Sequence, residues 1–72
     1  MERRHQQVLK GIGERIREIR KSKGLSQLDL ELECGIDRSE ISRIENGTKN
    51  IEVITLIKLA DAMQVSLKSL LD

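Results

Sequence analysis

The sequence contains no phenylalanine, tyrosine, tryptophan or proline, and only one cysteine. Without aromatic rings, the chain lacks the flat side chains on which single-stranded nucleic acids and sugars stack, whereas duplex DNA remains a possible ligand. One cysteine excludes an internal disulfide and a metal site with two or more thiolates. In a chain of 72 residues, we expect one domain over residues 1–72 with a core of aliphatic side chains.

Long apolar runs are also missing, because charged residues interrupt every apolar stretch well before bilayer length. The N-terminus lacks the apolar segment of a signal peptide. We therefore expect a protein of the cytoplasm that has no membrane partner.

Residues that carry catalytic or metal chemistry are few. His5 and Cys34 each stand alone, without further ligands at metal-binding spacing. Cys34 occupies an apolar turn position, so we expect a buried and unreactive thiol. No combination of nucleophile, base and orienting group is recognisable, and a domain of this size has little room for a substrate cleft. These absences argue against an enzyme and against a metal or other cofactor.

The charges are unevenly distributed along the chain, although the net charge is only +1. Residues 1–23 contain eight Lys and Arg against three acidic residues, a local balance of +5, whereas residues 24–37 contain four acidic residues and no basic one. A nucleic-acid ligand requires a basic face rather than a basic total, so this distribution leaves DNA binding possible.

Helical periodicity and capping residues predict five short helices and no strand, and therefore an all-α, compact five-helix bundle. The first helix ends at Lys23, before Gly24. It begins either near Val8, with residues 1–7 as a frayed extension, or already at Glu2. The other helices are expected at residues 27–33, 38–46, 51–64 and 67–71, with caps at Ser26, Asp37, Asn50 and Ser66.

Apolar residues at helical spacing predict the side of each helix that faces the core. Asp37 and Glu40, three residues apart, also predict a capping box at the start of the third helix. The expected core positions, in chain order, are Val8, Ile12, Ile16 and Ile19, then Leu28, Leu30 and Leu32, then Ile41 and Ile44, and then Val53 or Ile54, Ile57, Ala60 and Met63.

The second and third predicted helices are separated by a few residues that include Gly35, which can adopt positive φ and turn the chain sharply. This pattern predicts a helix-turn-helix over about residues 26–46. The segments LSQ (25–27) and GIDRSEISRIENG (35–47) resemble the phage repressor and Cro-type (XRE-like) helix-turn-helix family, whose DNA-binding domain is lambda-repressor-like. The resemblance covers about residues 12–71.

The resemblance implies that the third helix enters the major groove and that the N-terminus of the second lies over the phosphate backbone. An arginine can pair with O6 and N7 of guanine through two N–H groups, while serine discriminates less between bases. Asn50 is a weaker candidate than the other phosphate contacts, because capping of the fourth helix also explains it. The implied base-reading residues are Arg38, Ser39, Ser42 and Arg43, and the implied phosphate-binding residues are Gln27, Asn46, Lys49 and Asn50.

Two further positions follow from the resemblance. Arg20 and Glu45 are implied to form a partly buried ion pair with a structural role. Glu31 departs from the pattern, because a small alanine is common at that position. Either Glu31 extends its stem and keeps its carboxylate at the rim, or the second and third helices lie further apart than usual.

The function implied is that of a sequence-specific regulator of transcription that binds duplex DNA as a homodimer, with an inverted-repeat operator. Leu67, Leu70 and Leu71 are the expected dimer contacts, because apolar residues are dense there. We expect no small-molecule effector. The alternative is a protein-interaction domain that shares the fold but not the DNA contacts. The sequence leaves open the operator, the sign of regulation, and the choice among phage repressor, restriction-modification controller and antitoxin-like autoregulator.

Overall fold

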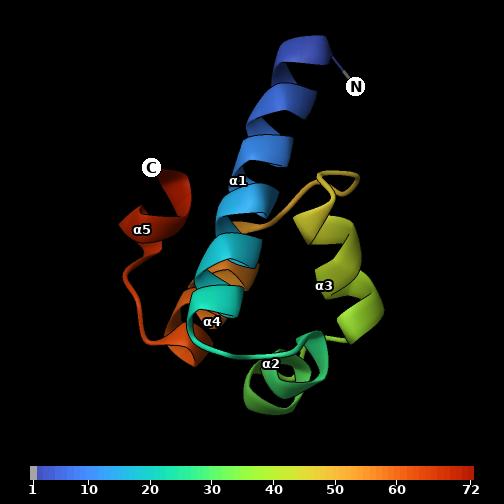
Figure 1. Cartoon of the computed structure of the whole chain (residues 1–72). Coiled ribbons are helices and arrows are strands. Elements are labelled where there is room, and N and C mark those ends of the chain that lie inside the picture. The colour runs from blue at the N-terminus through green and yellow to red at the C-terminus, as the bar shows by residue number, and fades with distance from the viewer. Residues whose placement is uncertain (1) are drawn as a thin grey trace.

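Every regular element of residues 2–72, the part of the chain that the computed structural model describes, is an α-helix. The chain folds into a bundle of five helices (Figure 1), which confirms the predicted fold class. The helices are α1 (Arg3–Ser22), α2 (Gln27–Cys34), α3 (Arg38–Glu45), α4 (Val53–Met63) and α5 (Leu67–Leu71). None of them is long and apolar enough to cross a membrane.

Helix α1 begins earlier than the weaker helix formers Gly11 and Gly13 suggest. The Glu2 carboxylate accepts a hydrogen bond from the Arg4 backbone N–H at 2.8 Å and caps the first turn. The helix thus has the earlier of the two predicted starts, with Glu2 as its cap, while Met1 lies outside the described residues. The first turns of α1 project beyond the other helices (Figure 1), and residues 2–8 are all exposed.

The predicted caps of α2 and α5 are confirmed, and that of α3 is confirmed in part. Ser26 and Asp29 form a capping box at α2, and Ser66 accepts from a backbone N–H at the start of α5. At α3, Asp37 accepts from the Ser39 N–H at 2.8 Å. The predicted reciprocal bond from Glu40 is wrong, because the Glu40 carboxylate lies 3.1 Å from Lys49 Nζ instead.

Helix α4 differs most from the prediction. It begins at Val53, and Asn50 is not its cap, since the N-cap position is Glu52, which makes no side-chain capping bond. The predicted inner stripe is also wrong at its start, because Val53, Ile54 and Ile57 are exposed. Apolar residues surround this helix, so periodicity alone does not identify its buried side.

The core consists of aliphatic side chains from all five helices. Helix α2 contributes only Leu30, because residues two apart on a helix point to different sides. Leu28 and Leu32 are exposed, contrary to the prediction, and Val8 is exposed on the projecting part of α1. The buried apolar residues are Ile16, Ile19, Leu30, Ile41, Ile44, Leu56, Leu59, Ala60, Met63 and Leu70.

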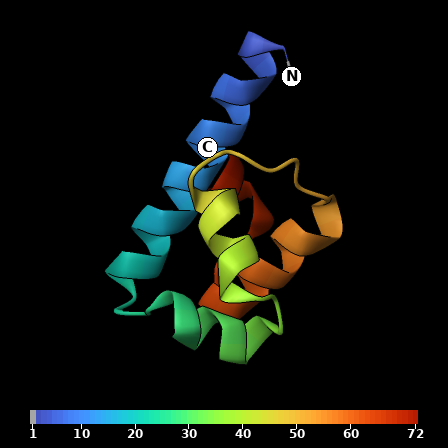
Figure 2. The same ribbon diagram turned by 90° about the vertical axis from the view of Figure 1, so that its right-hand side faces the viewer.

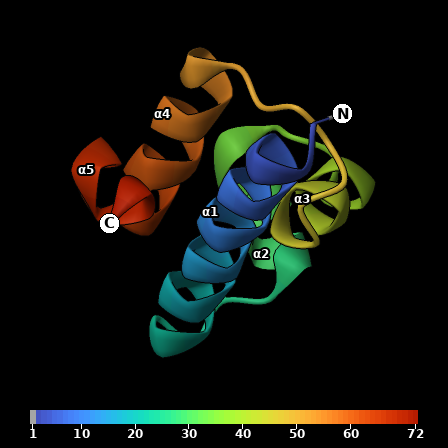
Figure 3. The ribbon, with the colours of Figure 1, turned by 90° about the horizontal axis from the view of Figure 1, so that it is seen from above.

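Helix α1 lies between α3 on one side and α5 on the other (Figure 3). Gly13 allows the close approach to α3, because a methyl group there would overlap the carbonyl oxygens of Ile44 and Glu45. Gly47, with φ of 71°, lies against the backbone of Lys10. Two glycines thus bring α1 onto the C-terminal end of α3.

Candidate nucleic-acid interface

Helices α2 and α3 meet at a sharp corner around Gly35, whose φ of 75° is the left-handed conformation predicted for it. Figure 2 shows α3 at the front of the molecule, with α2 below it. Ile41 and Ile44 bury the inner side of α3 in the core. The side chains on its outer side are therefore presented to solvent by a rigid helix.

The four predicted base-reading residues share this outer side. They occupy positions i, i+1, i+4 and i+5 of α3, a spacing that places them next to one another on a helix surface. Ser42 is half-buried, while the other three are exposed. The residues that the structure brings together on this side are Arg38, Ser39, Ser42 and Arg43.

Ser39 is held by the cap of its own helix. Its hydroxyl donates to Asp37 Oδ1 at 2.9 Å, in addition to the bond from its backbone N–H. These two hydrogen bonds, and then the nearby charges of Arg38 and Arg43, hold the pKa of the Asp37 carboxyl below its usual value. Asp37 therefore stays ionised to lower pH than an ordinary aspartate, and it directly precedes the arginine-bearing helix.

The predicted phosphate-binding residues flank α3 on both sides. Gln27 is the first residue of α2 and is half-buried, with its Nε2 3.1 Å from Glu45 Oε1. Asn46 and Asn50 are exposed on the segment that joins α3 to α4. Lys49, on the same segment, forms its ion pair with Glu40 of α3. The sequence did not reveal the hydrogen bond between Gln27 and Glu45 or the ion pair between Lys49 and Glu40, because no sequence pattern links these residues.

Arg20 and Glu45 form the ion pair that the resemblance implied. Arg20 Nε lies 2.7 Å from Glu45 Oε2, and their side chains are only 9% and 3% exposed. The hydrogen bond to Glu45 raises the pKa of Arg20 against the opposing effect of burial. The pair joins α1 to the end of α3 and so fixes the helix that carries the arginines.

Two further positions singled out in the sequence, Cys34 and Glu31, are both half-buried. Cys34 is half-buried against the core rather than fully buried. Glu31 is half-buried as well, and α2 still contacts α3 and α4. Within residues 2–72, no three possible ligands come together as a metal site.

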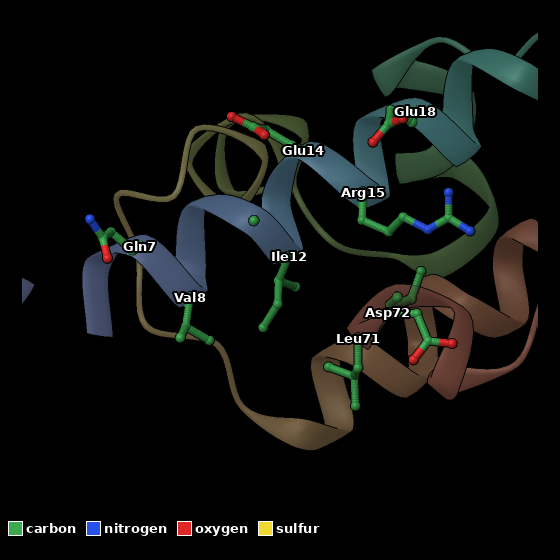
Figure 4. A pocket seen from close by; sticks show the side chains of 10 residues that line it. Gln7, Val8, Ile12, Glu14, Arg15, Glu18, Leu71 and Asp72 are labelled. Atoms are coloured by element: carbon green, nitrogen blue, oxygen red, sulfur yellow. The ribbon is translucent and has the colours of Figure 1, made fainter. Parts of the chain in front are cut away.

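The predicted dimer contacts at the C-terminus need correction. Leu70 is only 1% exposed and belongs to the core of its own subunit, and Leu67 is half-buried against that core. Leu71, at 53% exposed, is the member of the set that is accessible to a partner. It borders a groove of about 540 Å³ between α1 and α5, into which Val8 and Ile12 also point (Figure 4).

A second apolar surface lies at the N-terminal end of α4 and was predicted as core. Val53 and Ile54 are each 61% exposed, and Ile57, one turn further along the helix, is 37% exposed. Neighbouring exposed aliphatic residues of this kind are typical of a contact with another protein.

Helix α3 carries two exposed arginines, follows α2 after a sharp turn at Gly35, and is flanked by amide and basic side chains. This arrangement defines a helix-turn-helix DNA-binding domain. The helix-turn-helix family model matches residues 16–70 of this chain. The chain belongs to this helix-turn-helix family, as the sequence resemblance indicated.

Similar proteins agree with this assignment. The control protein C.BamHI of Bacillus amyloliquefaciens is 43% identical over 61 residues, which cover 83% of this chain and 75% of that protein. The restriction-modification controller protein C.AhdI from Aeromonas hydrophila has the same fold, with a TM-score of 0.88 and 38% identity over 92% of this chain and 96% of that one.

A third similar structure includes DNA. It is the restriction-modification controller protein C.Esp1396I as a tetramer in complex with its natural 35-base-pair operator. Its TM-score is 0.78 at 29% identity, over 90% of this chain and 96% of that one. Relatives of this chain are thus controller proteins and helix-turn-helix transcriptional regulators, which confirms DNA-binding regulation as the class of function.

Proposed function

We propose that this protein is a sequence-specific regulator of transcription that binds duplex DNA as a homodimer and controls a restriction-modification system. The observation that carries the proposal is the exposed pair Arg38 and Arg43 on the outer side of α3. Similarity to the restriction-modification controller protein C.AhdI and to the control protein C.BamHI supports the assignment to a restriction-modification system. The role is one of binding in the cytoplasm, without catalysis, cofactor or small-molecule effector.

Sequence reading follows from the side chains of α3. A helix fits the major groove, where a guanidinium can donate two hydrogen bonds to O6 and N7 of a guanine. Arg38 and Arg43 are therefore the guanine-reading residues. Ser42 and Ser39 supply less selective contacts, and the Ser39 hydroxyl acts as an acceptor because its proton is used by Asp37.

Phosphate contacts place α3 in register on the duplex. Gln27 and the free N–H groups at the start of α2 face one phosphate, and the segment after α3 faces another through Asn46, Lys49 and Asn50. Lys49 exchanges its bond with Glu40 for a phosphate contact on binding. With one such set in each half of a symmetric dimer, the operator is an inverted repeat.

The homodimer forms through the exposed apolar side chains of α4 and not through Leu70. Val53, Ile54 and Ile57 supply the apolar centre that a stable interface requires. Leu71, at the rim of the groove between α1 and α5, is a second exposed apolar position for the contact. A second copy of the same chain covers both, as expected for a two-fold symmetric contact.

A gel-shift assay with DNA fragments from around the protein's own gene tests the proposal. The parent protein is expected to retain a fragment from upstream of that gene, and a variant with both Arg38→Ala and Arg43→Ala is expected to lose it. Lys68→Ala controls for loss of a positive charge away from the interface, since α5 lies on the far side of the molecule from α3 (Figure 1). If the folded parent retains no fragment even at low salt, the fold serves as a protein-interaction domain instead.

A further inference from the structure

The carboxylate of Glu45 accepts hydrogen bonds from Gln27 as well as from its ion-pair partner Arg20. Its Oε2 accepts from Arg20 Nε at 2.7 Å, and its Oε1 accepts from Arg20 Nη2 at 3.0 Å. The same Oε1 also accepts from Gln27 Nε2 at 3.1 Å. A pair that only joined α1 to α3 would not require this third bond, which extends to the first residue of α2.

Arg20 also contacts the segment that leads into α2. Its Nη1 donates to the carbonyl oxygen of Leu25 at 2.9 Å, and the Leu25 N–H donates to the Arg20 carbonyl at 3.1 Å. Leu25 stands directly before Ser26, the cap of α2. The buried pair therefore fixes both the chain that enters α2 and the side chain of its first residue.

Gln27 joins this buried network to the surface. Its side chain is half-buried, and its primary amide has two N–H groups, of which Glu45 occupies one. The other N–H is free to donate to a phosphate beside the unpaired backbone N–H groups of the first turn of α2. A glutamine side chain has three rotatable bonds, and holding it in place before binding avoids the loss of entropy on binding.

We propose that Glu45 is a positioning residue for DNA binding: it orients the Gln27 amide toward a DNA phosphate, with Arg20 holding Glu45 and the entry to α2. The inference rests on the proposed function, because it takes Gln27 as a phosphate contact. The Glu45 carboxylate then connects the phosphate-contacting residue at the start of α2 to the C-terminal end of the base-reading helix α3.

A double-mutant cycle on DNA affinity tests the coupling. Gln27→Ala is expected to weaken binding to the operator about tenfold, as for loss of a hydrogen bond to a charged group. In a Glu45→Gln background, the same change is expected to cost only about twofold, because a carboxamide offers one acceptor oxygen in place of two and Arg20 competes with Gln27 for it. Lys49→Ala is the matched control, and its effect should be equal in both backgrounds. All affinities are measured well below the melting temperature of each variant.

The outcomes separate the two claims. If Gln27→Ala weakens binding equally in the parent and in the Glu45→Gln background, Gln27 is a phosphate contact and the positioning role is wrong. If Gln27→Ala has no effect in the parent, the phosphate contact itself is wrong and the inference ends with it.

Should Glu45→Gln fail to fold, Arg20→Lys replaces it in the cycle, since lysine keeps the charge but cannot reach both carboxylate oxygens and Leu25 together. In the free protein, the NMR signals of the Gln27 side-chain amide are expected to shift in the Arg20→Lys variant. Unchanged signals, together with an undiminished effect of Gln27→Ala, would overturn the proposal.

Discussion

Arg20 and Glu45 lie in a two-pronged ion pair, with Nε 2.7 Å from Oε2 and Nη2 3.0 Å from Oε1, buried between α1 and α3. Removing one partner leaves the other as a buried charge without compensation. We expect Arg20→Ala and Glu45→Ala each to lower the free energy of unfolding by about 3 kcal/mol. Denaturant melts measure it, and changes within about 0.5 kcal/mol for both variants would show that the pair contributes no more than a surface contact.

Gly13 and Gly47 allow α1 to lie close to the C-terminal end of α3. We expect Gly13→Ala to lower the free energy of unfolding by about 2 kcal/mol, because the added methyl group overlaps the backbone of α3. Gly11→Ala is the control, since it lies in the same helix with open space around it and should stabilise the protein by about 0.5 to 1 kcal/mol. Equal effects of the two changes in thermal melts would argue against the close approach.

The dimer surface is tested by one charge on α4. Ile54→Glu is expected to yield folded monomers in analytical ultracentrifugation, because a carboxylate in the apolar centre of an interface is costly to desolvate. Leu32→Glu is the control, since Leu32 is also exposed to solvent but lies on α2. Leu70→Glu should unfold the chain instead. An intact Ile54→Glu dimer would place the interface elsewhere.

Acid should weaken the two helix caps on either side of the corner. Backbone and side-chain hydrogen bonds lower the pKa of Asp29 and of Asp37 below that of the unfolded chain. Their contribution to stability is therefore complete above the unfolded pKa of about 4 and is lost as the pH falls through the lowered folded pKa.

The replacements Asp29→Asn and Asp37→Asn remove these titrations while leaving residues that can still cap a helix. We expect the difference in unfolding free energy between the parent and each variant to be present at about pH 6 and to diminish toward about pH 2, below the unfolded pKa. Denaturant melts across this range measure it. A difference that stays constant with pH would contradict ionised caps.

The sequence was sufficient to predict the elements that depend on local chemistry. The turn at Gly35 and the caps Ser26 and Ser66 follow from residue type, and the structure has them as predicted. The arginines of α3 could also be placed on its outer side, because Ile41 and Ile44 define the inner one.

What could not be predicted depends on tertiary packing. Helix α4 is apolar on several sides, so only the position of the other helices determines that Leu56 is buried and Ile54 exposed. The prediction of Leu70 as a dimer contact is wrong, because Leu70 is buried in the core of its own subunit. The spacing of the C-terminal leucines does not reveal this burial. The bond from Gln27 to Glu45 joins residues 18 apart and has no sequence signal.

The central claim is that α3 reads bases and that its flanks hold phosphates. Selection of bound sequences from a random DNA pool tests it most directly, when repeated for Arg38→Ala, Arg43→Ala and Lys49→Ala. We expect the parent to select an inverted repeat with a guanine in each half-site, and each arginine variant to lose preference at one position per half, with affinity reduced by about 1 to 3 kcal/mol. Lys49→Ala should keep the parental preferences, bind all sequences more weakly and reduce the slope of log affinity against log salt by about one unit per contact. The account is contradicted if both arginine variants select the parental sequence while Lys49→Ala selects a different one.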